Sequence, residues 1–383
     1  MNKAMSLTAV LAVLLLTSPA VAPCAEERDS SRVPSEKTLG DSRAVVGAIR
    51  WDAWHGDKSN VGRAVETALG PKRWHYRVPF FGGIVSDTQV AIRGYTQEIV
   101  DREIAYAHQA GLDYWAFGFY DASLPCMVEA RNLYLASRHK ADINFCLWSG
   151  PNDLVATQNV QRIVQLMREP TYQKVLGDRP LFYLGFVDDK WMKILSERQC
   201  TEELRRLARQ AGLGQPYLVL MDFRPAKGKK IADALGLDAI STYSCAGNGC
   251  GAPYAALVEH VENFWEQCKA AGAHTVPIVM TSADRRPRVE HPVPWEKYQK
   301  PGVGMDKFYE APTPAELAGH LEHALSWIRK NPEITPAKAV IIYAWNENDE
   351  GGWLIPTRDD AGRPDESRIQ AVSRVLRPVS PAR

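Results

Sequence analysis

Apolar residues gather in eight short segments along the chain, and most of these segments are followed by a stretch with helical periodicity. The segments are residues 44–51, 112–120, 143–148, 180–186, 216–222, 237–243, 276–281 and 339–345. They are nearly continuous rather than alternating in polarity, as is typical of parallel strands that are buried on both faces. The pattern therefore predicts a parallel β-sheet built from eight strands.

Amphipathic stretches separate these segments, and the clearest run over residues 96–110, 201–211 and 254–271 and from Thr313 onwards. Thr313 and Glu316 have the spacing of a capping box, and Gly111 directly follows the first of the stretches as a helix stop. Eight strands that alternate with helices over this length predict an α/β protein with a single-domain (β/α)₈ (TIM) barrel. An open doubly wound sheet is the alternative, but the glycine-rich nucleotide-binding loops typical of such sheets follow none of the eight strands.

The N-terminal residues indicate export. Lys3 precedes an apolar run at residues 7–16, and small residues follow at positions 20, 22 and 25, as in a secretory signal peptide. The run is shorter than the roughly 20 residues that a membrane span needs. A lipoprotein anchor on Cys24 is the alternative, although Pro23 fits that signal poorly. We expect a periplasmic or secreted protein with a signal peptide at 1–25, a flexible leader at 26–43 and the barrel at 44–383.

The charge balance excludes one class of partner. The chain has 46 Lys and Arg residues against 45 Asp and Glu residues, without long basic runs, so it has no electrostatic footprint of a nucleic-acid binder. No later stretch is apolar enough to span a membrane. In an oxidising compartment Cys245 and Cys250 are spaced to close a short loop with a disulfide, whereas Cys146 and Cys268 fit buried free thiols. The sequence leaves the oligomeric state open.

The active site of such a barrel lies at the carboxyl ends of the strands. Carboxylates, aromatic rings and polar side chains collect there, and we expect them to bind a sugar through stacking and hydrogen bonds. The expected substrate-binding residues are Trp51, Asp52, His55, Tyr120, Trp148, Asp222, Tyr243, Asp284, Arg288, Trp345 and Asn346. A pairing of Arg288 with Asp284, instead of with substrate, is the structural alternative. Two long excursions, a structureless loop at 52–89 and another at 284–312, are expected to shape the site.

The last strand leads directly into a cluster of acids. Residues 341–353 read IIYAWNENDEGGW, with Glu347 and Glu350 on one turn. Glycosidic cleavage commonly uses two carboxyl groups, one to protonate the leaving oxygen and one as base or nucleophile. Close packing is expected to raise the pKa of one glutamate and keep it protonated. The pair is therefore predicted to be catalytic; the alternative from spacing alone is a solvated acidic turn.

This segment resembles the family 99 glycoside hydrolases (endo-α-mannosidases and endo-α-mannanases) and the related WbsX-type proteins of polysaccharide loci. Their last strand ends in a Trp/Phe-Asn-Glu-x-x-Glu-Gly signature, which Trp345, Asn346, Glu347, Glu350 and Gly351 match. Weaker similarities at 110–113, 172–181 and 284–288 spread the resemblance over most of the barrel.

The resemblance implies a retaining glycoside hydrolase that forms a 1,2-anhydro sugar. Glu347 would act as the base toward the sugar 2-hydroxyl, and Glu350 as the acid at the leaving oxygen. Asn348 stands where an aromatic residue is usual, Ile355 replaces a common acidic residue, and Asp349 adds a third carboxylate. These departures leave the sugar open, with an α-mannoside-like poly- or oligosaccharide as the expectation.

Other chemistries have weaker signals. The nine histidines include no His-Glu-x-x-His, and His320 and His323 lack a nearby third ligand, so we expect neither a metal nor a cofactor. The sequence contains no Gly-x-Ser-x-Gly nucleophile elbow, so it does not indicate a serine hydrolase. Two alternatives stay open: a WbsX-type glycosyltransferase-like protein, which export would separate from cytoplasmic sugar nucleotides, and a non-catalytic carbohydrate-binding barrel.

Overall fold

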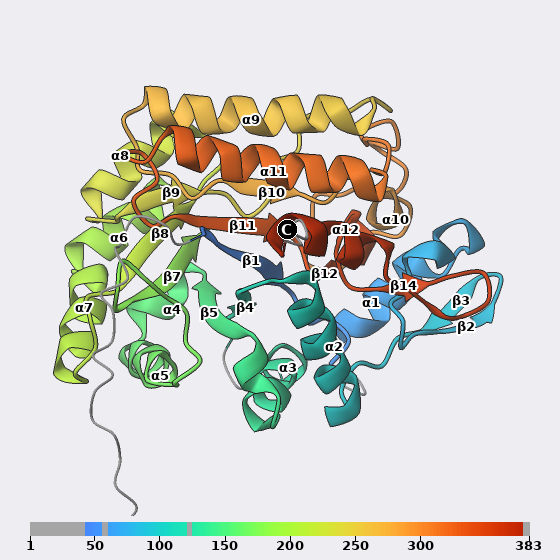
Figure 1. The fold of residues 1–383 in the computed structure, drawn as a ribbon, viewed down its shortest axis with the longest axis horizontal. Coiled ribbons are helices and arrows are strands. Elements are labelled where there is room, and N and C mark those ends of the chain that lie inside the picture. The colour runs from blue at the N-terminus through green and yellow to red at the C-terminus, as the bar shows by residue number, and fades with distance from the viewer. Residues whose placement is uncertain (1–42, 56–59, 121–124, 378–383) are drawn as a thin grey trace, which may run out of the picture. The chain divides into compact units, whose positions relative to one another are not determined.

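The computed structural model describes residues 43–55, 60–120 and 125–377. Its centre is a sheet of eight parallel strands in the order β10-β11-β1-β4-β5-β7-β8-β9, which forms a nearly closed barrel (Figure 1). The strands are β1 (Val45–Arg50), β4 (Tyr114–Gly118), β5 (Asn144–Ser149), β7 (Arg179–Gly185), β8 (Tyr217–Met221), β9 (Ala239–Ser241), β10 (Ile278–Met280) and β11 (Ala339–Tyr343). Each lies within or beside one of the eight predicted segments, so the (β/α)₈ prediction is confirmed.

The two end strands of the sheet, β9 and β10, meet through hydrogen bonds between β9 and the residues just before β10. The backbone NH of Ile240 donates to the carbonyl of His274 at 2.8 Å, and the NH of Val276 donates to the carbonyl of Ile240 at 2.9 Å. By contrast, β1 is bonded in register to β11 on one side and to β4 on the other. The barrel is therefore held most extensively around β1 and least extensively between β9 and β10.

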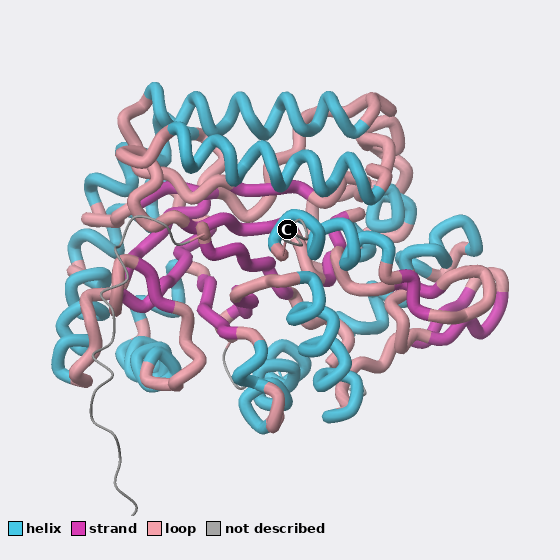
Figure 2. The backbone as a smooth tube through the Cα atoms, viewed as in Figure 1, coloured by secondary structure: helices cyan, strands magenta, loops and turns pink. Residues whose placement is uncertain are grey.

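Helices surround the strands, as the tube in Figure 2 shows. They are α1 (Asn60–Leu69), α2 (Gln97–Ala110), α3 (Pro125–Ala136), α4 (Pro151–Val155), α5 (Thr157–Met167), α6 (Asp189–Glu197), α7 (Cys200–Gln210), α8 (Pro225–Ala234), α9 (Tyr254–Ala270), α10 (Arg286–Glu290), α11 (Pro314–Lys330) and α12 (Ser367–Leu376). Short 3₁₀ turns lie at η1 (Lys72–Arg77), η2 (Lys140–Asp142) and η3 (Asn348–Glu350). No helix in the described residues is long and apolar enough to cross a membrane.

The predicted helix signals operate as expected. The Thr96 side chain caps α2 by accepting from the NH of Ile99 at 3.3 Å, and Gly111 ends the helix with a φ of 82°. Thr313 and Glu316 form the complete capping box of α11. Because each helix has an apolar stripe, such as Leu317, Leu321 and Ile328 in α11, it packs on the outer surface of the sheet.

The interior of the barrel is filled by large side chains. Tyr114 and Tyr183 meet inside the barrel, with their hydroxyl oxygens 2.8 Å apart. Gly47 on β1 makes room for this, since a Cβ atom there would lie 2.3 Å from the Tyr114 ring. The core is thus packed solid below the strand ends, and any ligand must bind above it.

The prediction of a structureless loop at 52–89 is wrong. Its described part contains α1, η1 and the first strand of the hairpin β2 (Gly83–Ser86) and β3 (Gln89–Ala91). α1 buries Val65, Ala68 and Leu69, and this short apolar stripe stabilises a helix in a segment that the sequence predicts as a loop. Four short strands complete the described structure around the last turn: β12 (Asn346–Glu347), β13 (Gly352–Trp353), β14 (Thr357–Arg358) and β15 (Pro364–Asp365), while β6 (Lys174–Val175) pairs with β7.

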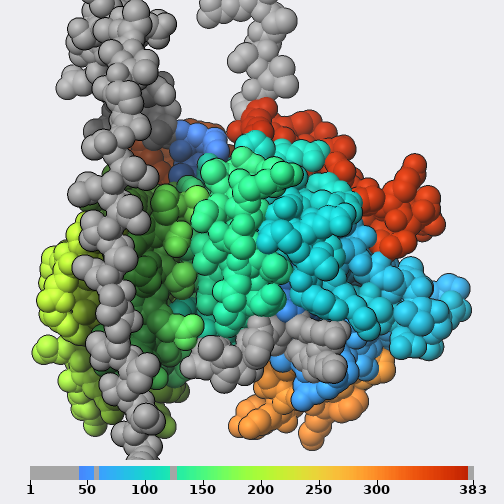
Figure 3. Space-filling view, turned by 90° about the horizontal axis from the view of Figure 1, so that it is seen from below, coloured from blue at the N-terminus to red at the C-terminus, as the bar shows by residue number. Residues whose placement is uncertain are grey.

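The two predicted excursions lie beside each other. Trp74 in η1 donates from its indole nitrogen to Glu290 at 3.1 Å, and the Trp51 and Trp295 rings are 5.4 Å apart. Figure 3 shows the orange segment near residue 300 next to the blue segment that follows β1. The predicted signal peptide at 1–25 lies outside the described residues, as does the leader up to residue 42; the compact unit begins at Arg43.

Candidate active site

The two glutamates of the predicted catalytic pair follow β11 on a segment that is fixed to β1. The side-chain oxygen of Asn346 accepts from the backbone NH of Trp51 at 2.8 Å, and its amide nitrogen donates to Asp52 at 3.1 Å. Trp345 is fully buried, and its indole nitrogen donates to Glu103 of α2 at 3.0 Å. Because both residues before Glu347 are held by side-chain hydrogen bonds, the start of the acidic turn has a defined position.

Arg288 of α10 binds all three acids of the turn. Its Nε donates to Asp349 at 2.6 Å, one terminal nitrogen lies 3.3 Å from Glu347, and the other donates to Glu350. The same nitrogen that reaches Glu350 also reaches Glu296 at 3.2 Å. Arg288 is only 4% exposed, so these contacts occur where water screens charge weakly. One guanidinium therefore holds Glu347 and Glu350 next to each other.

Two tyrosines distinguish the glutamates. The hydroxyl of Tyr243, which follows β9, donates to one oxygen of Glu347 at 2.6 Å. The hydroxyl of Tyr343, at the end of β11, donates to Glu350, and Arg285 lies 3.6 Å from the other oxygen of Glu350. Glu350 therefore faces two guanidinium groups and a hydroxyl donor, whereas Glu347 has one hydroxyl donor and a longer contact to Arg288.

These surroundings move the two pKa values apart. Burial raises the pKa of Glu347 well above its usual range, and repulsion from Glu350 adds to the effect, although Arg288 opposes it. Burial alone would also raise the pKa of Glu350, but the attraction of Arg288 and then of Arg285 outweighs it and lowers that pKa. The surroundings thus favour the neutral form of Glu347 and the charged form of Glu350, the reverse of the distribution that the family resemblance implies.

A chain of aromatic rings leads along the strand ends to Glu347. The indole nitrogen of Trp51 donates to the Tyr120 hydroxyl at 3.2 Å, and Tyr120 packs edge-on against Trp148 with ring centroids 5.8 Å apart. Trp148 in turn lies 5.1 Å from Tyr243, which binds Glu347. Four of the predicted substrate-binding residues are therefore continuous with the glutamate pair.

Other predicted residues are occupied by protein partners. Asp52 accepts from the buried Arg50 at 2.7 Å, and His55 lies between Asp52 and Glu103 at 3.4 and 3.8 Å. This buried network supports Trp51 from below. Asp52 and His55 are thus engaged by protein partners in the described structure.

Asp222 and Asp284 are likewise bound within the protein. Asp222 forms a bidentate pair with Arg224, with nitrogen–oxygen distances of 2.9 and 2.7 Å. Asp284 binds Arg77 and, at 2.8 Å, Arg286. The alternative pairing of Asp284 with Arg288 is therefore not the arrangement found, because Arg288 turns to the three acids of the turn instead.

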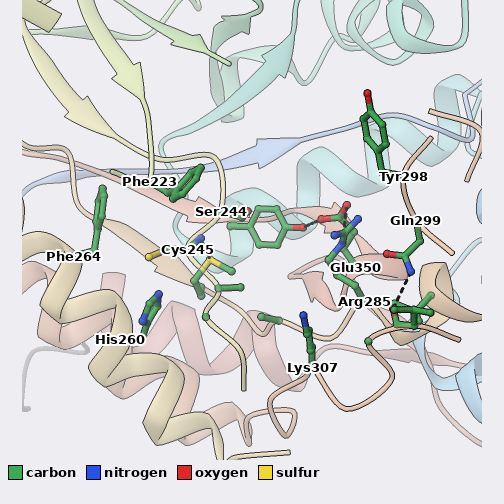
Figure 4. Close-up of a pocket in the computed structure, with 18 of the residues that line it drawn as sticks. Phe223, Ser244, Cys245, His260, Phe264, Arg285, Tyr298, Gln299, Lys307 and Glu350 are labelled. Carbon is green, nitrogen blue, oxygen red and sulfur yellow. Dashed lines mark hydrogen bonds and ion pairs between the residues drawn. The ribbon is translucent and has the colours of Figure 1, made fainter. Parts of the chain in front are cut away.

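A cavity of about 930 Å³ opens beside Glu350. Tyr343, Met280 and Glu350 line it at the strand ends, His260 and Phe264 of α9 form one side, and Lys300 and Lys307 belong to the second excursion. Figure 4 shows Glu350 and Arg285 pointing toward each other at one end, with His260 and Phe264 farther along. Glu350, but not Glu347, faces this space.

Several residues of the site escaped sequence reasoning. Tyr343 lay within the predicted last strand and Arg285 at the seventh strand end, but neither was expected to bind a glutamate. Trp295 and Glu296 lie in the second excursion, which has no periodicity from which their position could be read. A long loop at the rim was the available signal.

The expected disulfide is absent, since Cys245 and Cys250 are both free thiols. Cys245 is a buried residue of the cavity lining, with its backbone NH 3.3 Å from the sulfur of Met280, whereas Cys250 is exposed. One cysteine is buried and the other is exposed, and the short loop is not bridged. Within the described residues, no group of three or more His, Cys, Asp or Glu side chains has the arrangement of a metal site.

Comparison with solved structures supports the fold. A structure titled "Glycoside hydrolase-like protein" matches with a TM-score of 0.58 at 12% identity, over 91% of this chain and 97% of the other. The family 99 endo-α-mannosidase of Bacteroides thetaiotaomicron, in complex with BIS-TRIS-propane, matches with a TM-score of 0.52 at 14% identity, over 86% and 95% of the two chains. A second structure of that enzyme gives a TM-score of 0.51 at 12% identity, over 87% and 98%. No protein-family model matches the chain, and no curated protein does.

At these identities the likeness establishes a shared barrel architecture. The chain shares the (β/α)₈ barrel of these solved structures. Because barrels of this kind support many chemistries, the reaction must be argued from the site itself.

Proposed function

We propose that this protein is a glycoside hydrolase that cleaves a poly- or oligosaccharide with Glu347 and Glu350 as its catalytic carboxyl groups. The observation that supports the proposal is the pair of glutamates at the strand ends of a barrel, joined by Arg288 and each bound by a different tyrosine, Tyr243 or Tyr343. Glycosidic cleavage needs one protonated and one ionised carboxyl group at the same bond. The surroundings of this pair move the two pKa values apart, as that requires.

In the proposed reaction Glu347 gives its proton to the leaving oxygen as the glycosidic bond breaks. Glu350 takes the proton of the sugar 2-hydroxyl, whose oxygen closes on the anomeric carbon to form a 1,2-anhydro sugar. Water then opens this ring: Glu347 takes a proton from the water, and Glu350 returns its proton to the 2-oxygen. Both glutamates end in their starting states, and two inversions give retention.

In this reaction Glu347 is the acid and Glu350 the base, whereas the family resemblance implies the opposite roles. The contacts of the two glutamates support the assignment proposed here. Glu350 accepts from Tyr343 and Arg288, which favours the charged form that a base requires. Glu347 is 3% exposed and has no comparably close cation, which favours the neutral form. The finer expectation of an α-mannoside-like substrate rests on the family resemblance alone. The proposal that the protein is exported to the periplasm or the medium rests on the N-terminal sequence alone.

The aromatic chain fits a saccharide ligand. Trp51, Tyr120 and Trp148 lie together at the strand ends, with Trp51 and Trp148 largely buried, and the apolar C–H faces of sugars pack against aromatic rings. Trp295, which is 39% exposed and packs against Trp51, extends this surface toward solvent. We therefore propose that sugar rings bind along this aromatic surface on the way to the glutamates.

Turnover on a panel of α-mannans and other polysaccharides tests the proposal, with Glu347→Gln and Glu350→Gln as the test variants. Glu310→Gln, an exposed glutamate outside the site, is the matched control and should keep full activity. If Glu347 is the acid, Glu347→Gln should slow poor leaving groups by roughly 10²–10⁴-fold and activated aryl glycosides far less. Glu350→Gln should slow both kinds of substrate alike.

The opposite pattern would restore the roles implied by the family resemblance. Full activity in either variant would end the carboxylate-pair proposal. Saccharide binding without any turnover would indicate the non-catalytic barrel instead, and transfer from a sugar nucleotide would indicate the glycosyltransferase-like alternative.

A further inference from the structure

The cavity beside Glu350 has a charge pattern that the proposed reaction does not require. Its lining includes three permanent cations, Arg285, Lys300 and Lys307, together with His260, and Glu350 is the only carboxylate among the described residues that line it. The charge of Glu350 is already bound by Arg288 and Tyr343. The cavity therefore presents positive charge to any ligand that reaches Glu350.

The two lysines are available for a ligand. Lys300 and Lys307 are exposed, and among the described residues neither side-chain nitrogen forms a hydrogen bond or an ion pair. Most other lysines near a carboxylate on this protein are paired, as Lys227 is with Asp189 at 2.9 Å and Lys229 with Asp233 at 2.6 Å. Lys300 and Lys307 thus contribute positive charge that pairs with no acidic side chain in the described part of the chain.

The neutral part of the lining suits a sugar. Asn263 and Gln267 of α9 bring amide groups, and Phe264 and Tyr298 bring ring surface. Its volume of about 930 Å³ lies near the upper end of the ~300–1,000 Å³ of ligand pockets, which leaves room for more than one small ring. Polar, aromatic and cationic groups in one cavity match a saccharide that carries an anionic group.

We propose that this cavity binds an acidic sugar unit of the substrate, with a carboxylate or sulfate group directed to Lys300 and Lys307. This inference rests on the proposed function, because it places the acidic unit next to the bond that Glu350 acts on. Arg285 is held by Glu350 and Glu296, so its charge is largely used within the protein. The two lysines are therefore the groups that select for the anion.

The test measures binding by isothermal titration calorimetry in the Glu347→Gln protein, whose substituted residue does not line the cavity. The probes are uronate oligosaccharides with their carboxyl-reduced counterparts, and sulfated oligosaccharides with their desulfated counterparts. Each pair keeps the same backbone and differs only in charge. We expect the charged member to bind more tightly and the difference to shrink as salt is raised.

Lys300→Ala and Lys307→Ala should each weaken binding of the charged probe roughly 2- to 10-fold, between the effect of an exposed ion pair and that of a charge-assisted hydrogen bond. Binding of the neutral counterpart should not change. Lys297→Ala, an exposed lysine of the same segment that does not line the cavity, is the matched control. A preference for uronate or for sulfate alone would each support the proposal and identify the anion.

Equal binding of charged and neutral members, or lysine variants that bind like the control, would overturn the inference. So would the failure of every acidic probe to bind. Hydrolysis of a neutral polysaccharide by the wild-type protein in that case would leave the glycoside hydrolase proposal standing, so the two failures are distinguishable.

Discussion

Replacing Arg288 by Met is expected to destabilise the protein through the acids that it leaves behind. Arg288 is 4% exposed and binds Glu347, Asp349 and Glu350. Asp349 is 1% exposed and depends on this guanidinium for both of its oxygens, at 2.6 and 3.3 Å. Removing one partner of a buried ion pair costs about 3–5 kcal/mol, because the remaining charge stays buried without compensation. We therefore expect a loss of that size in the free energy of unfolding at neutral pH.

The loss should depend on pH with a defined sign. The folded-state pKa of Glu350 is lowered, so in the wild type this group adds stability above its unfolded-state pKa, and the contribution is lost as the pH falls through the folded-state value. The variant lacks the main cation that lowers this pKa. Its deficit should therefore be largest near pH 7 and shrink as the pH falls below the ordinary carboxyl range, about pH 4.

Urea unfolding of both proteins across this range measures the deficit directly. Arg206→Met is the matched control, since Arg206 binds Glu203 at 2.6 Å and the two side chains are 48% and 36% exposed. An exposed pair contributes up to about 1 kcal/mol, and little change is expected in the control. A deficit for Arg288→Met that equals that of the control, or one that is the same at both ends of the pH range, would refute the reasoning.

Three further outcomes are expected. Tyr243→Phe removes a hydrogen bond that lowers the pKa of Glu347, so the upper limb of the pH–activity profile should move to higher pH; an unchanged limb would argue against Glu347 as the acid. The raised pKa of Glu347 means that wild-type stability falls as the pH rises from its unfolded-state pKa toward its folded-state value, and Glu347→Gln, compared with the wild type by urea unfolding, should remove that slope. A thiol reagent on the folded, unreduced protein should label Cys250 quickly and Cys245 slowly, because Cys245 is buried and its pKa is raised to about 12; equal rates would contradict the placement of the two side chains.

The barrel could be predicted from the sequence because each strand carries its own signal. A segment such as AVIIY in β11 is buried at every position, and a continuous apolar run is what a parallel strand in a barrel requires. Gly111 and the Thr313 capping box gave helix ends in the same local way. The first excursion was misjudged because α1 has only a short apolar stripe and lacks acidic residues in its first turn.

The site could be predicted in part. Glu347, Glu350 and Asn346 lie within one short stretch of sequence, so their proximity required no knowledge of the fold. Arg288 contacts Glu347 across 59 positions of sequence, and the choice between Asp284 and the acidic turn depends on how α10 packs. The order of the two pKa values could not be predicted for the same reason. It depends on Tyr343 and Arg285, whose side chains reach Glu350 only in the folded chain.

The uneven bonding of the barrel divides its rim into two arcs with different tolerance for change. On the arc from β11 through β1 to β4, each strand is hydrogen-bonded over several consecutive residues, and the acidic turn is tied to it by Asn346 and Trp345. On the arc where β9 meets β10, much of the cavity lining comes from α9 and from the loop at 298–307, beside Met280 and Tyr343 at the strand ends. Substitutions in α9 or in this loop can therefore retune ligand preference while Arg288 and Tyr243 still hold the carboxyl groups, which makes this scaffold a practical starting point for directed evolution of specificity.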